Sequence, residues 1–190
     1  MSAFTWPPEP STFGISDRPS RSAAAEQIQA AVLVPLFLAA EAREPHVVLT
    51  RRRADLRRHA GEISFPGGRR DAEDADLAET ALREAEEEIG LPRSQVQLLG
   101  ELPPTSTFAT NYVIHPFVGV IPEGLAWRPS AREVEAVLEL PLQALRSGKT
   151  RTRLERRGIA FETDAFVVEE HLIWGATARI LDDLMRQLDG

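Results

Sequence analysis

The segment that most constrains the fold is a helix predicted for residues 74–90, DADLAETALREAEEEIG. Small and aliphatic side chains recur at every fourth position and therefore share one helical face: Leu77, Ala81, Ala85 and Ile89. Asp74 or Asp76 suits the N-cap, because a short acidic side chain can accept a free backbone N–H at a helix start. Gly90 followed by Pro92 predicts an abrupt C-terminal end.

Short aliphatic and β-branched runs surround this helix in the sequence and predict strands. They cover residues 30–37, 45–52, 62–68, 96–103, 112–122, 134–142 and 166–175, and a further hairpin is predicted around residues 157–158. Residues 142–148 predict a helical turn, and an amphipathic helix closes the chain with Ile180, Leu181, Leu184 and Leu188 facing inward. Strands outnumber helices and their connections are irregular, which predicts a mixed β-sheet between helices rather than a regular array of parallel units.

Composition narrows the class of protein. The 190 residues suit one domain at 25–190, preceded by an irregular arm rich in Pro and Ser at 1–24. A net charge of −7 argues against general nucleic-acid binding. The longest apolar run, residues 30–40, is too short for a membrane span and contains Pro35. The absence of cysteine and of a basic, then apolar, N-terminus predicts a cytoplasmic protein.

The stretch REAEEEIG, residues 83–90, gathers four glutamates near the end of the predicted helix. Glu84, Glu87 and Glu88 lie three or four residues apart and project together, whereas Glu86 points elsewhere. A solvated acidic face is the ordinary interpretation of such a run. However, like charges at this spacing destabilise a helix by roughly 0.2–0.5 kcal/mol per pair, and the helix dipole adds roughly 0.3–1 kcal/mol per charge. A hard cation such as Mg²⁺ or Mn²⁺, which binds carboxylate oxygens and phosphates, removes the conflict.

The helix and the glycine turn before it resemble the Nudix box. The matching residues are Gly68, Arg83, Glu84, Glu87, Glu88, Gly90 and Leu91, with Ala85 at an aliphatic position. The resemblance implies the Nudix fold, an α/β/α sandwich, and the hydrolysis by water of a nucleoside diphosphate joined to another group. It also implies Mg²⁺ or Mn²⁺ bound by the three glutamates, with Arg83 holding them in place and one carboxylate, for which we favour Glu87, acting as the base.

The loop between the glycine and the helix is one residue longer than in the general box. Gly68 lies fifteen residues before Arg83, and counting forward from Gly68 places Asp74 where the box has its first, largely structural acid. The stretch LTRRRADLRRHAGEISFPGG before the box, and the longer loop itself, resemble the coenzyme A pyrophosphatase branch of the family. Arg53 departs from that signature, which has Ser or Ala there.

This narrower resemblance implies coenzyme A, or a derivative, as the substrate. Candidate substrate-binding residues are Arg52, Arg57, Phe65, Gly67, Gly68, Arg69 and Arg70. Arginine suits a ligand with a pyrophosphate and a further 3′-phosphate, because its planar guanidinium makes paired phosphate contacts. The alternative is that Arg52 and Arg57 are surface charges that balance an acidic protein.

Other interpretations remain open from the sequence. A Nudix enzyme for ADP-ribose, a dinucleoside polyphosphate or a nucleoside triphosphate would keep the helix and reassign the arginines. A non-catalytic binding module of the same fold is less favoured, because all three glutamates are present. Glu133 and Glu135 are either a distal acid over the metal or exposed strand-edge charges, while Ile173 and Trp174 are expected to pack in the core. The oligomeric state is not predicted.

Overall fold

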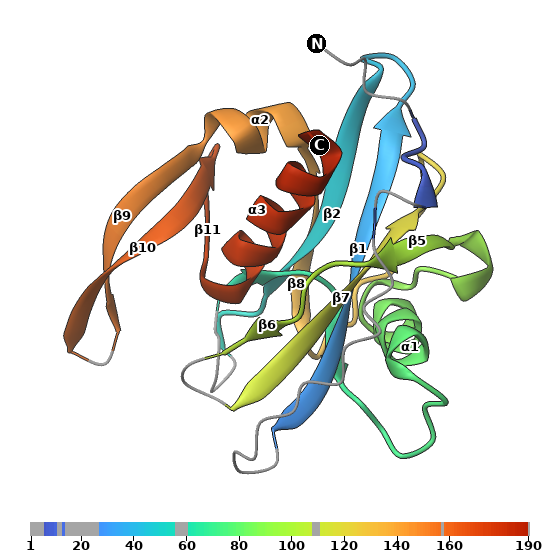
Figure 1. The fold of residues 1–190 in the computed structure, drawn as a ribbon, viewed down its shortest axis with the longest axis horizontal. Coiled ribbons are helices and arrows are strands. Elements are labelled where there is room, and N and C mark those ends of the chain that lie inside the picture. The colour runs from blue at the N-terminus through green and yellow to red at the C-terminus, as the bar shows by residue number, and fades with distance from the viewer. Residues whose placement is uncertain are drawn as a thin grey trace.

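Two β-sheets dominate the computed structural model, which describes residues 6–10, 13, 27–55, 61–107, 111–156 and 158–189. The larger, eight-stranded sheet runs in the order β3–β2–β1–β7–β5, with β4 paired to β1, β6 to β7 and β8 to β2. These strands are β1 (Ile28–Ala39), β2 (Glu44–Arg52), β3 (Ile63–Ser64), β4 (Gly67–Arg69), β5 (Gln97–Glu101), β6 (Thr105–Ser106), β7 (Tyr112–Val120) and β8 (Val134–Pro141). β1 and β7 are parallel and the other pairs are antiparallel, so the sheet is mixed, as predicted (Figure 1).

Strand β1 separates two hydrophobic cores because successive side chains of a strand point to opposite faces. Val34 and Leu36 belong to one core, whereas Leu33 and Phe37 belong to the other. Both faces of the strand are buried, which explains why its sequence is a nearly continuous apolar run instead of an alternating one.

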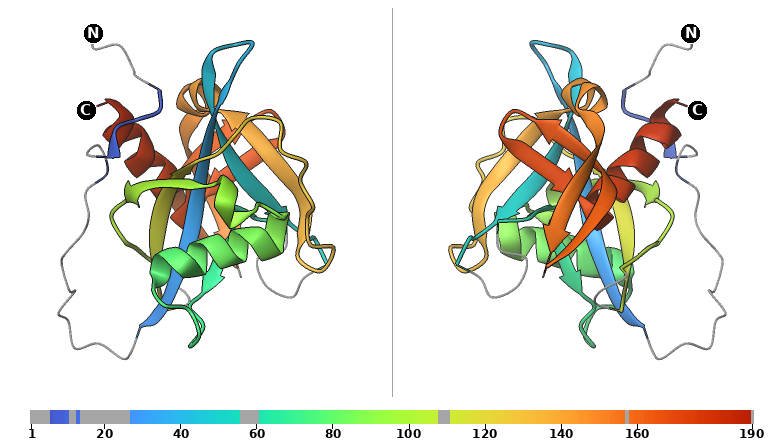
Figure 2. Two further views of the ribbon diagram at one scale, coloured as in Figure 1. Left: turned by 90° about the vertical axis from the view of Figure 1, so that its right-hand side faces the viewer. Right: turned by 90° about the vertical axis from the view of Figure 1, so that its left-hand side faces the viewer.

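Helices cover both faces of this sheet (Figure 2). α1 (Leu77–Ile89) packs Ala81, Ala85 and Ile89 against one face, and α3 (Gly175–Asp189) packs on the other. Two short helices are also present, η2 (Arg93–Gln95) and α2 (Leu142–Ser147). The predicted mixed sheet between helices is confirmed.

The second sheet has three strands in the order β11–β10–β9: β9 (Lys149–Arg156), β10 (Ile159–Val168) and β11 (His171–Trp174). The single strand predicted for residues 166–175 is therefore wrong. The chain turns back between Val168 and His171, which pair with each other across the hairpin. Glu169 has a positive φ of 54° there, a conformation that Gly or Asn usually signals in a sequence and that glutamate does not.

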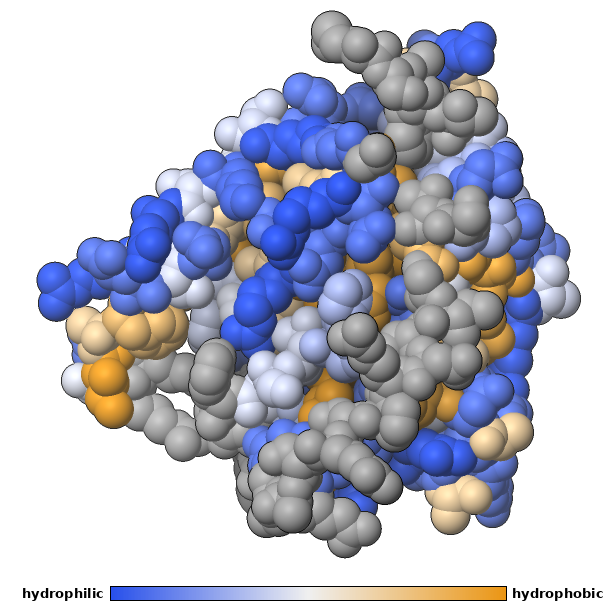
Figure 3. Space-filling view, in the orientation of Figure 1, coloured by the Kyte–Doolittle hydropathy of each residue, from blue (hydrophilic) through white to orange (hydrophobic). Residues whose placement is uncertain are grey.

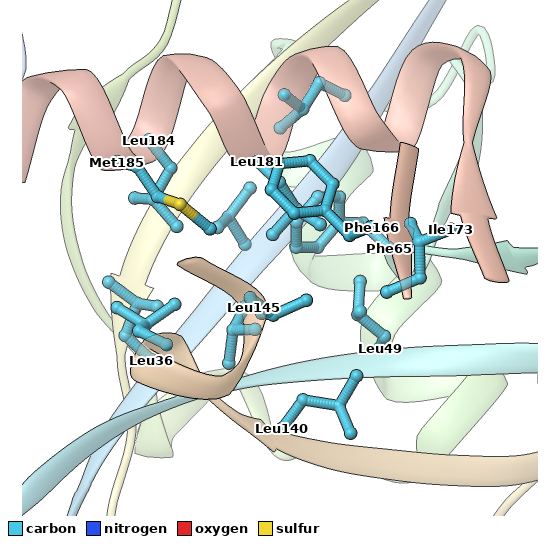
Figure 4. Packing of buried hydrophobic residues seen from close by; sticks show 14 of the residues in the cluster. Leu36, Leu49, Phe65, Leu140, Leu145, Phe166, Ile173, Leu181, Leu184 and Met185 are labelled. Carbon is cyan, nitrogen blue, oxygen red and sulfur yellow. The ribbon is translucent and has the colours of Figure 1, made fainter. Parts of the chain in front are cut away.

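The core on the α3 side joins the two sheets (Figure 4). Leu181, Leu184 and Met185 of α3 pack there with residues of both sheets, including Leu49 and Phe166. Leu188, predicted to face inward with them, is partly buried against this core.

Phe13 belongs to the same core and is only 2% exposed. Gly100 leaves the room for it, because a Cβ at Gly100 would lie 2.6 Å from Phe13 Cβ. Phe13, which lies in the predicted N-terminal arm, thus supplies a side chain to this core. Among the helices that the structure describes, none has the length and apolar character that crossing a membrane requires.

Candidate active site

Both ends of α1 are fixed by hydrogen bonds. Asp76, rather than Asp74, is the N-cap and accepts the Glu79 N–H at 2.8 Å. At the other end Gly90 is left-handed, with φ 69°, and its N–H bonds back to the last turn. The loop between β7 and β8 caps two further carbonyls, with the Ser130 N–H 2.8 Å from the Glu88 carbonyl and the Arg128 N–H 2.9 Å from that of Ile89. The turn that carries the glutamates is therefore held rigidly.

The four glutamates of this turn occupy different environments. The side chains of Glu84 and Glu88 are 18% and 9% exposed, whereas that of Glu87 is 60% exposed. Glu86 is 48% exposed and points away, as predicted, but it is not simply solvated, because Arg93 Nε lies 3.0 Å from its carboxylate.

Two glycines of β4 bring the backbone against the glutamates. The Gly67 N–H donates to Glu88 Oε2 at 3.2 Å. A Cβ at Gly68 would lie 2.5 Å from Glu84 Oε1, and one at Gly67 would lie 2.4 Å from the Ala31 carbonyl oxygen. A side chain at Gly67 would push β4 away from the backbone of β1, so this glycine is required by close packing, whereas a side chain at Gly68 would displace the Glu84 carboxylate.

Arg83 joins the loop to the glutamates, as the sequence predicts. Its guanidinium contacts Asp74 at 2.8 and 3.0 Å, Glu84 at 3.0 Å and Glu87 at 3.3 Å. Asp74 is 5% exposed and also accepts the Thr80 hydroxyl at 2.8 Å. These hydrogen bonds, Arg83 first, hold the pKa of Asp74 well below its usual range despite burial.

Burial disfavours ionisation of two of the glutamates. It raises the pKa of Glu88 to about 7, although the Gly67 N–H and Arg52 act in the opposite direction and Glu84 adds repulsion. Burial also raises the pKa of Glu84, against the stabilising charge of Arg83 and with repulsion from Glu87 and Glu133. Buried carboxylates that repel one another are a donor set that fits a hard divalent cation.

The carboxylates are not drawn tightly together. Among the described residues, three potential ligand atoms lie within 4.8 Å of one another only at Glu169, Glu170 and His171, in the β10–β11 turn. On α1 the carboxylates are instead spread by their bonds to Arg83 and Gly67. The residues fit a metal by chemistry and by position on one helix face.

Arg52 reaches the glutamates from the neighbouring strand β2. One guanidinium nitrogen lies 3.8 Å from Glu88 Oε1 and the other 3.3 Å from Glu133 Oε2. The Glu133 carbonyl also accepts the Arg53 N–H at 3.0 Å. Glu133 therefore stands beside the helix glutamates rather than at a remote strand edge. Its place could be read from the sequence only if the antiparallel pairing of β2 with β8 were known.

The other predicted substrate-binding residues differ in position. Arg69 is exposed on β4. Arg70 donates to the carbonyls of Asp74 and Ala75, both at 3.1 Å, and so supports the loop before α1. Phe65 is 3% exposed within the core, so we propose packing as its role in place of a substrate contact. Arg57 lies outside the described residues.

Comparison with known proteins agrees with this geometry. The profile of the NUDIX domain matches residues 27–160. The chain is 43% identical over 164 residues to the uncharacterized Nudix hydrolase NudL of Salmonella paratyphi B, a match that spans 85% of this chain and 83% of that protein. The same values hold for NudL of Salmonella enteritidis. The chain belongs to the Nudix family. Membership of this family, together with the similarity to these relatives, supports the hydrolysis of a nucleoside diphosphate derivative as its reaction.

Solved structures show the same fold at low sequence identity. A MutT/nudix family protein from Enterococcus faecalis aligns with a TM-score of 0.61 and 16% identity, over 90% of this chain and 66% of that one. The NUDIX domain of Shewanella oneidensis NrtR, crystallised with ADP ribose, aligns with a TM-score of 0.56 and 14% identity, over 87% and 91% of the two chains. At this identity the likeness establishes the fold alone.

Proposed function

We propose that the protein hydrolyses the pyrophosphate of coenzyme A, or of a coenzyme A derivative, to 3′,5′-ADP and 4′-phosphopantetheine. One observation supports this most directly: Arg52, from the stretch that resembles the coenzyme A branch, lies 3.8 Å from Glu88 of the box. The two sequence signatures thus meet at one place. An arginine beside the glutamates suits the charged phosphates that the reaction brings there.

Glu84, Glu87 and Glu88 are proposed to hold the metal, with Glu88 oriented by the Gly67 N–H. Bound Mg²⁺ or Mn²⁺ would supply charge neutralisation at the phosphoryl oxygens. Arg83 ion-pairs with Glu84 and Glu87 and donates to Asp74, so its role is to keep the carboxylates in place.

Glu87 is proposed as the general base because it is the most exposed of the three and so the most accessible to water. It would take a proton from the attacking water as the new P–O bond forms and the bond to the bridging oxygen breaks. Arg52, released from its contacts with Glu88 and Glu133, would bind a phosphate of the pyrophosphate.

The direct test is turnover of coenzyme A against ADP-ribose, a dinucleoside polyphosphate and a nucleoside triphosphate, with Mg²⁺ or Mn²⁺. We expect coenzyme A to have the highest kcat/KM, and Glu87→Gln to lower kcat by about 100-fold or more. ADP-ribose cleaved far faster than coenzyme A would refute the substrate assignment. Near wild-type turnover in Glu84→Gln, Glu87→Gln and Glu88→Gln would refute the mechanism.

A further inference from the structure

A cavity of about 430 Å³ lies on the opposite side of β2 from the helix glutamates. Its walls come from β2 and β3 of the larger sheet and from all three strands of the smaller one. In Figure 3 the β9–β10 hairpin projects from the body of the molecule, with a hollow between the two. The residues that matter for its chemistry are Arg51, Phe161, His171 and Trp174.

Two polar side chains on the cavity wall, Arg51 and His171, are incompletely paired. Arg51 Nε is buried and bonds to no acceptor, while Nη2 of the same side chain lies 3.6 Å from Glu135. His171 is 6% exposed, and its imidazole makes no hydrogen bond to the described residues but lies 3.8 Å from the Glu170 carboxylate. A buried donor without an acceptor destabilises a protein by about 1–3 kcal/mol, so Arg51 Nε at the cavity wall points to an anionic or carbonyl-rich ligand.

The same cavity offers a surface for a flat ring. Phe161 and Trp174 have ring centroids 5.9 Å apart and planes tilted by 47°. Aromatic side chains of this kind stack on nucleobases irrespective of base identity. Three acidic residues also line the cavity: Glu155 is exposed, the Glu170 side chain is 71% exposed, and Glu62 is half-buried. Neither Glu155 nor Glu170 accepts a hydrogen bond from the buried Arg51 Nε.

The cavity lies within reach of the glutamates. Arg51 and Arg52 are consecutive residues of β2, at an irregularity in its pairing with β8; Arg51 lines the cavity while Arg52 reaches Glu88. Ile63 lines the cavity, and Gly67, which bonds Glu88, follows four residues later. Four residues span at most about 14 Å, a distance that a nucleotide and its pyrophosphate can bridge around the short strand β3.

We propose that this cavity binds the adenine ring and the 3′-phosphate of the substrate, a proposal that rests on the proposed function. The ring stacks on Phe161 and Trp174, and the phosphate accepts hydrogen bonds from Arg51 and His171. The pantetheine arm offers Arg51 only neutral amide carbonyls, whereas the 3′-phosphate offers a stronger, charge-assisted acceptor, which favours the nucleotide end. Arg51 is therefore the residue that distinguishes coenzyme A from nucleotides without a 3′-phosphate.

Binding of the nucleotide product tests this without catalysis. Calorimetric titration of the full chain with 3′,5′-ADP and with 5′-AMP should show about 10-fold to 100-fold tighter binding of 3′,5′-ADP by the wild type, the range for a charged hydrogen bond to phosphate. Arg51→Gln should bring the two affinities within about 3-fold. Phe161→Leu should weaken both nucleotides equally, since both carry adenine. The matched control Arg151→Gln removes an arginine of β9 that is 68% exposed and pairs with Glu162, and it should leave the preference intact.

A wild type that binds both nucleotides equally, or an Arg51→Gln variant that keeps the preference, would overturn the cavity proposal. Steady-state turnover of coenzyme A and dephospho-coenzyme A separates it from the proposed function. If Arg51→Gln loses the binding preference but the wild type does not hydrolyse coenzyme A, the proposal for the cavity stands and the proposed reaction is rejected. If the wild type and Arg51→Gln both hydrolyse coenzyme A with equal KM values, the proposed reaction stands and the proposed binding role of the cavity is rejected.

Discussion

Replacing Asp74 by Asn tests whether the loop before α1 depends on the bond to Arg83. The Asp74 carboxylate accepts two hydrogen bonds from Arg83, at 2.8 and 3.0 Å, one from Thr80 at 2.8 Å and one from the Asp71 N–H at 2.9 Å. An amide of the same shape has one acceptor oxygen, so an Arg83 N–H must face an NH2 group. One charge-assisted hydrogen bond contributes about 1.5–3 kcal/mol, and the remaining bonds lose their charge assistance.

We therefore expect the free energy of unfolding to fall by about 3 kcal/mol at pH 7 in Asp74→Asn. For a chain of this size that corresponds to a decrease in Tm of roughly 6–12 °C. Urea denaturation followed by circular dichroism measures the first quantity, and a thermal scan measures the second. Asp71→Asn is the matched control, because its 69% exposed carboxylate lies 3.8 Å from the same arginine and should contribute less than about 0.5 kcal/mol.

The stability contributed by the Asp74–Arg83 ion pair depends on pH in a defined way. The pKa of Asp74 is lower in the folded protein than the value of 3.8 that is usual for the free side chain. The stability that it contributes is therefore complete above that value and is lost as the pH falls toward the folded pKa. The difference between wild type and Asp74→Asn should be constant from pH 7 to about 5 and should narrow below about 4. A loss under about 1 kcal/mol at pH 7, or a gap that does not narrow in acid, would refute this explanation.

Three further substitutions test the packing around the site. Phe13→Ala should destabilise the protein by about 3–5 kcal/mol in urea denaturation, because the ring is 2% exposed, whereas Ile159→Ala, at 70% exposure, should have almost no effect. Gly68→Ala should lower kcat by at least about 10-fold with little change in Tm, since the added Cβ meets the Glu84 carboxylate at 2.5 Å; unchanged turnover would contradict it. Gly90→Ala should lower the free energy of unfolding by about 1–2 kcal/mol, because φ is 69° there, and an unchanged urea midpoint would count against the left-handed cap.

Local sequence was sufficient for the elements whose determinants are close together in the chain. α1 spans Leu77–Ile89 because its apolar side chains recur every fourth residue and Gly90 can adopt the left-handed cap. The same helical geometry separated Glu86 from the other three glutamates. The bounds of α1 and the direction of Glu86 depend on residues a few positions apart, so they can be predicted from periodicity and capping.

Contacts between distant segments were decided only by the tertiary structure. Pairing of β2 with β8 brings Glu133 to Arg52, although 81 positions separate the two residues. Packing of the N-terminal segment onto Gly100 buries Phe13, and the fold of the smaller sheet against β2 and β3 surrounds Arg51 with a cavity. Local sequence patterns do not predict these contacts, because side-chain burial and charge pairing depend on which strands become neighbours in space. The sequence by itself determined the helix and the order of its carboxylates. The tertiary structure determined which arginine side chains lie next to those carboxylates.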